Sequence, residues 1–254
     1  MPEYFQPPHN TSIMLLAAGH GTRMKPLTDH TPKPLLKVGA HSLIEHHLYR
    51  LKEQGFNHVV INTAYLGHKI QQALGNGERY GLEINYSDES NTGALETAGG
   101  IKKSLALIKS DSFISINADI YTDYDFRDLL KSSLAKLGTL VLVKNPKHNP
   151  DGDFDVTIES ENSNANLISD NLNIGNFNIE TPKKANRRMT YSGIALYKKG
   201  MFAQLPEGKL ALGPILKQEI SNGNLSSIAH DGHWTDVGTP ERLEKLSNSI
   251  KQSA

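Results

Sequence analysis

Continuous apolar runs recur along the chain and are separated by segments with helical periodicity. The run at 13–18 is closed by Gly19, which is typical of a strand buried on both faces of a parallel sheet. Shorter apolar runs at 59–61, 113–116 and 140–143 repeat this pattern. Each of these runs therefore predicts a strand near the centre of a sheet.

Segments between and after these runs predict helices and further strands. Ser42 and Glu45 have capping-box spacing, and Gly55 is placed to end the helix that they begin. Further helices are expected at 68–74, 101–108, 125–137 and 210–220, and from Pro240 onwards; further strands are expected at 82–86 and 189–197 and near 228 and 233–235. This alternation predicts an α/β fold in a single domain, with a Rossmann-like, doubly wound, predominantly parallel mixed sheet.

Two segments depart from this alternation. Residues 1–12 are polar and Pro-containing, and they predict a flexible tail in front of a domain at 13–254. Residues 146–188 are rich in Asn and Ser and lose the periodicity. They predict a hairpin or a partly mobile surface excursion from the domain.

Composition narrows the possible partners. The 254 residues are 37% hydrophobic, which is enough for a substantial core, and 27 Lys and Arg balance 27 Asp and Glu. This balance argues against nucleic acid or an anionic membrane as a partner, and no protein partner is evident. Cys is absent, which excludes thiolate chemistry, and no apolar run reaches the ~20 residues of a membrane span. We expect a cytoplasmic protein.

A loop rich in small and basic residues follows the first predicted strand. Gly19 and Gly21 allow backbone N–H groups to approach an anion closely, and Arg23 and Lys33 add positive charge. The loop matches neither the Walker pattern nor the dinucleotide fingerprint, which needs a third glycine where Met24 stands. The residues alone therefore leave two interpretations open, a phosphate site and a glycine turn with solvated charges.

Two aspartates are candidates for metal chemistry. Asp119 comes just after the strand at 113–116, where a carboxylate points into the ligand crevice of an open sheet. Asp236 stands in a turn before the last predicted helix. Each residue could also be an ordinary turn or cap aspartate, and spacing does not pair them.

The motif Leu-Ala-Ala-Gly-x-Gly-Thr-Arg-Met-x-Pro-Leu-Thr at 16–28, followed by Pro-Lys-Pro, resembles the signature of the sugar-phosphate nucleotidyltransferases. The resemblance extends from Ile13 to about Leu246. It implies a GT-A-like fold and transfer of a nucleotide from a nucleoside triphosphate to a sugar 1-phosphate with Mg²⁺. It further implies that Asp119 and Asp236 hold the metal, and that Arg23 and Lys33 act with Asp119 in catalysis.

The resemblance also implies the binding residues. The nucleotide-binding residues are Ala18, Gly19, Gly21, Thr22, Arg23, Lys33, Glu96, Thr97 and Gly99, and the substrate-binding residues are Asn117 and Asp153. No protein base is required, because the second pKa of a phosphate monoester is near ~6 and the sugar phosphate is itself the nucleophile.

Several segments narrow the expected substrates. Leu-Glu-Thr-Ala-Gly-Gly-Ile at 95–101 and Gly-His-Trp-Thr-Asp-Val-Gly-Thr at 232–239 are similar to uridylyltransferases of peptidoglycan recycling. This similarity implies that the nucleoside triphosphate is UTP and that the sugar phosphate is N-acetylmuramate 1-phosphate. The alternatives are a guanylyl- or thymidylyltransferase acting on mannose or glucose 1-phosphate, and a catalytically silent nucleotide-sensing module. A histidine metal site at His230 and His233 is disfavoured against scattered surface histidines.

Overall fold

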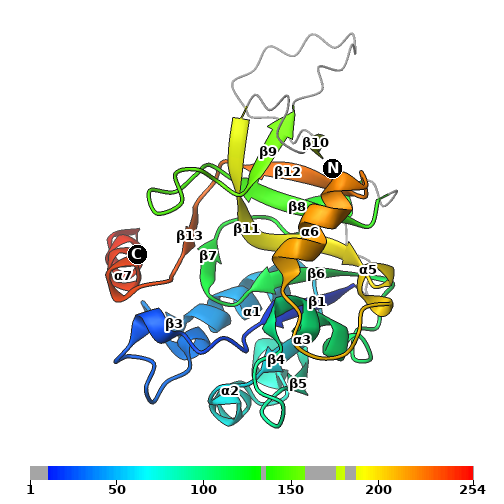
Figure 1. Ribbon diagram of the computed structural model, residues 1–254. Coiled ribbons are helices and arrows are strands. Elements are labelled where there is room, and N and C mark those ends of the chain that lie inside the picture. Colours follow the sequence, from blue (N-terminus) through cyan, green and yellow to red (C-terminus); the bar gives the residue numbers. More distant parts are fainter. Residues whose placement is uncertain (1–10, 133–135, 158–175, 181–186, 254) are drawn as a thin grey trace, which may run out of the picture.

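The computed structural model describes residues 11–132, 136–157, 176–180 and 187–253. Nine strands form one mixed sheet in the order β5-β4-β1-β6-β11-β8-β12-β10-β9 (Figure 1). The strands are β1 (Ser12–Leu16), β4 (His58–Thr63), β5 (Glu83–Asp88), β6 (Ser112–Asn117), β8 (Gly138–Val143), β9 (Phe154–Thr157), β10 (Asn176–Glu180), β11 (Arg187–Lys198) and β12 (Leu225–His230). β5, β4, β1 and β6 run parallel, as do β8 and β12, whereas β11 is antiparallel to both β6 and β8.

Two small ribbons and a set of helices complete the fold. β2 (Lys37–Val38) pairs with β3 (His41–Ser42), and β7 (Ile120–Thr122) pairs with β13 (Trp234–Asp236). The helices are α1 (Leu43–Glu53), α2 (Gly67–Leu74), α3 (Glu96–Ser104), α4 (Arg127–Leu130), α5 (Gly200–Ala203), α6 (Leu212–Ser221) and α7 (Pro240–Ser253). α3 begins earlier than expected, and the helix expected at 125–137 is only the short α4. Within the described residues, no helix combines the length and the apolar character that crossing a membrane requires.

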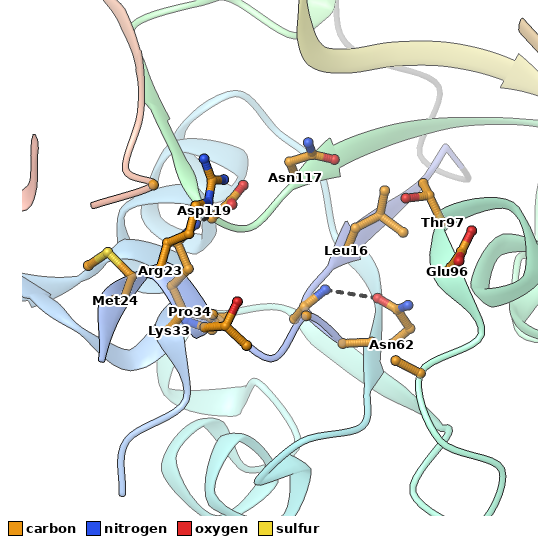
Figure 2. A pocket seen from close by; sticks show the side chains of 17 residues that line it. Leu16, Arg23, Met24, Lys33, Pro34, Asn62, Glu96, Thr97, Asn117 and Asp119 are labelled. Atoms are coloured by element: carbon orange, nitrogen blue, oxygen red, sulfur yellow. Dashed lines mark hydrogen bonds and ion pairs between the residues drawn. The ribbon is translucent and has the colours of Figure 1, made fainter. Parts of the chain in front are cut away.

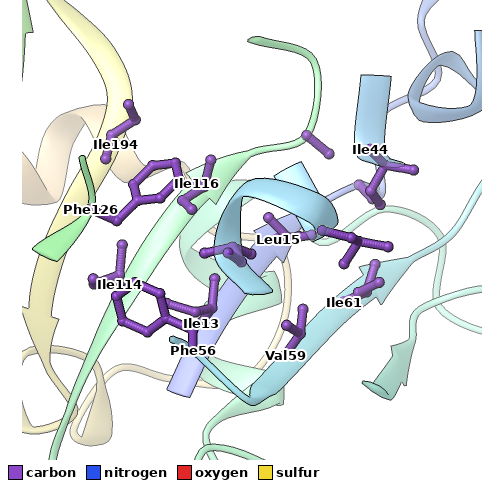
Figure 3. Packing of buried hydrophobic residues seen from close by; sticks show 14 of the residues in the cluster. Ile13, Leu15, Ile44, Phe56, Val59, Ile61, Ile114, Ile116, Phe126 and Ile194 are labelled. Atoms are coloured by element: carbon purple, nitrogen blue, oxygen red, sulfur yellow. The ribbon is translucent and has the colours of Figure 1, made fainter. Parts of the chain in front are cut away.

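Alternate residues of β1 pack into two cores on opposite faces of the sheet. Ile13 and Leu15 join a cluster with Ile44 of α1, as Figure 3 shows, whereas Met14 joins a cluster with Ile101 of α3. All of these side chains are fully buried, and each contributes roughly 1.5–3 kcal/mol of transfer free energy. The continuous apolar run of β1 thus reflects a strand covered on both faces.

The predicted capping box begins α1. The Ser42 backbone N–H donates to Glu45 Oε2 at 2.8 Å, and the Ser42 hydroxyl donates to the same oxygen at 2.7 Å. Burial raises the pKa of Glu45, but the hydrogen bonds from Ser42 and from the Tyr80 hydroxyl outweigh this effect and lower the pKa to about 2. The capping box therefore fixes the start of α1 with a charged carboxylate, which also suits the helix dipole.

The segment at 146–188 contributes strands to the main sheet. β9 and β10 pair antiparallel, β10 extends the sheet beyond β12, and β9 also pairs with the first residues of β11. The expected hairpin is therefore part of the sheet where the structure describes it, and residues 158–175 and 181–186 lie outside the described residues. At the other end, Ser12 is fully buried in β1, so the sheet begins inside the predicted tail; residues 1–10 are also outside the description.

Candidate functional site

A cavity of about 340 Å³ opens at the carboxyl-terminal ends of β1, β4 and β6 (Figure 2). It is lined by ten of the site residues predicted from the sequence: Ala18, Gly19, Gly21, Thr22, Arg23, Lys33, Glu96, Thr97, Asn117 and Asp119. Arg23, Lys33 and Asp119 lie toward one end, and Glu96 and Thr97 lie toward the other. The cavity therefore has a charged end and a second end formed by the start of α3.

Gly21 allows the loop after β1 to fold tightly against Lys33. Its backbone is left-handed, with φ of 63°, and a Cβ there would lie 3.1 Å from both Lys33 Cβ and Thr28 Cγ2. The Thr28 hydroxyl donates to the Gly21 carbonyl at 2.9 Å and closes the loop. A residue other than glycine would have a strained backbone at this position, and its side chain would press against Lys33 and Thr28.

Lys33 and Asp119 form an ion pair inside the cavity. Lys33 is 8% exposed, and its Nζ donates to Asp119 Oδ2 at 2.5 Å. The Asp119 side chain is 36% exposed, and Arg23 lines the same cavity. A buried ammonium, a guanidinium and a carboxylate thus converge where phosphate groups and a cation could bind together.

Asp236 lies on the chain segment next to Asp119. The antiparallel pairing of β7 with β13 sets Asp236 opposite Ile120, and the Val237 N–H donates to the Asp119 carbonyl at 2.8 Å. Asp236 is not among the lining residues, but its Oδ2 would lie 3.2 Å from a Cβ on Gly238, which does line the cavity. Asp236 therefore stands at the rim.

Both carboxylates have cationic partners. Asp236 accepts from Arg242 at 2.5 Å, and His148 Nε2 lies 2.9 Å from the same carboxylate, while Asp119 pairs with Lys33. Within the described ranges, no group of three or more His, Asp or Glu side chains is placed to hold a metal. Two carboxylates suit Mg²⁺, which keeps waters and takes its other ligands from phosphate oxygens. The residues present therefore fit a magnesium ion bound together with a nucleotide.

His47 supports the strand that follows Asp119. It is buried, and its Nε2 lies 2.9 Å from the Ile120 carbonyl. Burial lowers the pKa of His47 to about 4. The neutral imidazole therefore donates to the Ile120 carbonyl at neutral pH and holds β7 against α1.

The start of α3 has an unusual backbone. Glu96 lines the cavity with φ of 60°, a left-handed conformation that is strained for a residue other than glycine. Gly99 lies outside the lining residues: its N–H donates to the Leu210 carbonyl at 3.2 Å, and a Cβ there would lie 3.1 Å from the Leu210 nitrogen. A crossing segment of the chain therefore accounts for a glycine at this position, and the nucleotide-binding role of Gly99 stays a prediction.

Asp153 also lies outside the lining residues. Its carboxylate accepts from the Tyr191 N–H at 2.8 Å and from the Asn149 amide at 3.0 Å. These bonds fix the turn before β9 against β11. The structure thus brings Asn117 into the cavity but gives Asp153 hydrogen-bond partners elsewhere.

Asn62 and Ala94 line the cavity but were not predicted. Asn62 is 2% exposed, and its Oδ1 accepts from the Ala17 N–H at 2.8 Å, a bond drawn in Figure 2. A polar residue directly after the apolar run at 59–61, at the carboxyl end of a strand, is a signal that could have found it. Ala94 carries no comparable signal.

Comparisons with known proteins find relatives over nearly the whole chain. The model of the nucleotidyl transferase family matches residues 12–253. The chain is 44% identical to an N-acetylmuramate alpha-1-phosphate uridylyltransferase from Neisseria meningitidis, over 91% of the chain and 95% of that protein. It is 29% identical to the enzyme of the same name from Caulobacter vibrioides, over 90% of the chain and 92% of that protein.

A solved structure shows the same fold. A putative glucose-1-phosphate thymidylyltransferase from Bacillus anthracis superposes with a TM-score of 0.74 at 24% identity, covering 95% of each chain. This likeness confirms the Rossmann-like, GT-A-like single-domain fold expected from the sequence.

Proposed function

The chain belongs to the nucleotidyl transferase family, and from this premise we propose that it transfers the uridylyl group of UTP to N-acetylmuramate 1-phosphate in peptidoglycan recycling. One observation carries the proposal: a single cavity gathers Arg23, Lys33 and Asp119, with Asp236 on the adjacent segment. The identity of 44% to a uridylyltransferase of that specificity favours UTP and this sugar phosphate. Because UTP is the proposed donor, the proposal includes a cytoplasmic location.

The proposed reaction is a displacement at the α-phosphorus of UTP. An oxygen of the sugar phosphate forms a bond to this phosphorus, and the bond to the oxygen that bridges to the β-phosphorus breaks. The electron pair leaves with pyrophosphate, so the products are UDP-N-acetylmuramate and pyrophosphate. Since the sugar phosphate is already anionic, no side chain has to remove a proton.

The main obstacle is repulsion between two polyanions, and the proposed roles follow from it. Arg23 and Lys33 bind the triphosphate oxygens and stabilise the charge that develops on the pyrophosphate. Mg²⁺ held by Asp119 and Asp236 supplies further charge neutralisation at the phosphates. Ala18, Gly19, Gly21, Thr22, Glu96 and Thr97 line the nucleotide position, and Asn117 binds the sugar phosphate.

A substrate panel tests the proposal. UTP, GTP and dTTP are each combined with N-acetylmuramate, mannose and glucose 1-phosphates in the presence of Mg²⁺, and pyrophosphate release is measured. We expect the highest kcat/KM for UTP with N-acetylmuramate 1-phosphate, and loss of activity on chelation. A preference for GTP or dTTP contradicts the proposed specificity, and no release with any pair contradicts the proposed activity.

A further inference from the structure

A chain of buried hydrogen bonds connects two walls of the cavity. The Ala17 N–H donates to Asn62 Oδ1 at 2.8 Å, and Asn62 Nδ2 donates to Glu89 Oε1 at 2.7 Å. Glu89 Oε2 then accepts from the Leu95 N–H at 2.8 Å. Asn62 is 2% exposed and Glu89 is fully buried, so water does not replace these bonds.

The chain of bonds joins four segments at the carboxyl edge of the sheet. Ala17 follows β1, Asn62 lies near the end of β4, Glu89 follows β5, and Leu95 precedes α3. One end is the backbone N–H of Ala17, which lines one wall of the cavity, and the other is the N–H of Leu95, which precedes Glu96 in the opposite wall. The separation of these walls is therefore set by two side chains.

Gly100 makes room for the connection. A Cβ at this position would lie 2.6 Å from Asn62 Nδ2 and 2.7 Å from Glu89 Oε1. Any side chain here would force the two groups apart. The glycine in the first turns of α3 is thus explained by the Asn62–Glu89 pair beneath it.

We propose that Asn62 and Glu89 are positioning residues that set the width of the cavity at the start of α3, where the nucleoside would bind, and hence the affinity for the nucleoside triphosphate. The buried acceptor of Glu89 also holds Leu95, so that Glu96 keeps its left-handed backbone in the wall. The reaction takes place at the charged end, so the pair acts through binding of the nucleoside and has no contact with the reacting atoms. The inference rests on the proposed function for the identity of the triphosphate.

Isosteric exchanges separate the hydrogen-bond pattern from shape. In Glu89→Gln, the amide NH₂ must face one of two N–H donors, so one buried bond is lost whichever way it turns. In Asn62→Asp, two carboxyl groups face each other. The exchange variant Asn62→Asp/Glu89→Gln restores every bond. Its new carboxylate at position 62 would accept from the Ala17 N–H and from the new amide at position 89, whose oxygen would accept from the Leu95 N–H.

The test measures the Kd of UTP with Mg²⁺ by calorimetry and the separate KM values for UTP and N-acetylmuramate 1-phosphate. Each single variant is expected to raise the Kd and the KM for UTP about 10-fold or more, without changing the KM for the sugar phosphate. The exchange variant is expected to bind UTP within about threefold of the wild type. A general packing defect would not show this rescue.

Gln54→Glu is the matched control. Gln54 is a buried amide that bridges the Tyr124 carbonyl and the Phe126 N–H away from the cavity. The reverse isosteric change there, amide to carboxyl, also breaks a buried hydrogen bond and is expected to lower the melting temperature while leaving the Kd of UTP unchanged. If it weakens UTP binding as much as Glu89→Gln does, the positioning role is refuted.

The remaining outcomes are equally decisive. Single variants that bind UTP like the wild type, or an exchange variant as weak as the singles, overturn the proposal. If a single variant does not fold, the exchange variant decides: UTP binding within about threefold supports the pair, and a loss of about 10-fold refutes it. A wild-type protein that binds no UTP contradicts the proposed function instead, which keeps the two failures apart.

Discussion

Replacing Gly193 by alanine is expected to displace Asn117 and to reduce use of the sugar phosphate selectively. Gly193 lies in a bulge of β11, where the register with β8 shifts, and its φ is 81°. A Cβ there would lie 2.5 Å from Asn117 Nδ2 and 2.8 Å from its Cγ. The backbone of the bulge is held in place, because the Ser192 carbonyl accepts from Trp234 Nε1 at 2.9 Å and the Ser192 hydroxyl donates to the Val141 carbonyl.

The expected losses of stability and of kcat/KM depend on whether the backbone at position 193 or the Asn117 side chain moves. Alanine in a left-handed conformation costs about 1–2 kcal/mol in free energy of unfolding. Among the described residues, no hydrogen bond fixes the Asn117 amide, so its side chain rotates away from the new methyl group. Loss of a hydrogen bond to a charged phosphate is worth about 1.5–3 kcal/mol, or about 10- to 100-fold in kcat/KM for the sugar phosphate.

The assay compares Gly193→Ala with Gly223→Ala. Gly223 also has a left-handed backbone, with φ of 72°, but among the described residues other than its chain neighbours no heavy atom would lie within 4 Å of a Cβ there. Both variants are expected to lose similar stability in urea, and only Gly193→Ala is expected to lose kcat/KM for N-acetylmuramate 1-phosphate. Adding Gly193→Ala to Asn117→Ala should cause little further loss. Wild-type kinetics in Gly193→Ala, or equal losses in both glycine variants, would refute the reasoning.

Three further predictions follow from the site. Asp119→Asn should reduce turnover at least about 100-fold while the chain remains folded by circular dichroism, and near wild-type turnover would rule out the metal role. Lys33→Met should raise the KM for UTP and lower kcat by about 100-fold in the pyrophosphate assay, and a change under about threefold would remove Lys33 from the triphosphate site. His47 has a pKa of about 4 against 6.5 when unfolded, so the unfolded chain binds more protons between these values, and stability should fall by up to about 3 kcal/mol as the pH drops from 7 to 4. His47→Gln should remove that part of the pH dependence measured by urea unfolding, and an unchanged slope would show that the histidine is not its source.

Much of the fold follows from local patterns. The apolar run at 13–18 predicts a strand that is covered on both faces, and the prediction holds because helices pack on both faces of β1. Capping-box spacing predicts the start of α1. The helix expected at 125–137 ends early at Leu130. There the Ser132 hydroxyl donates to the Leu129 carbonyl at 2.6 Å, a side-chain bond that competes with the helical pattern. Periodicity does not register such competition.

The site was predictable where one short motif carries several groups, as in the loop with Arg23 and Lys33. Sequence spacing could not pair Asp119 with Asp236, because their proximity depends on the ribbon of β7 and β13. Nor could it find the bond between Asn62 and Glu89, since a buried polar residue is explained only by its tertiary partner. Gly99 shows the converse: a glycine in a plausible binding motif serves the crossing of another segment.

The most direct measurement follows the α-phosphorus of UTP itself. UTP labelled with ³²P at the α-position is incubated with N-acetylmuramate 1-phosphate and Mg²⁺, using the wild type and Asp119→Asn. If Arg23, Lys33 and Asp119 surround one triphosphate, the label appears in UDP-N-acetylmuramate in equal amount to the released pyrophosphate, and the variant transfers almost none. Label recovered as UMP, or equal transfer by both proteins, would contradict the account.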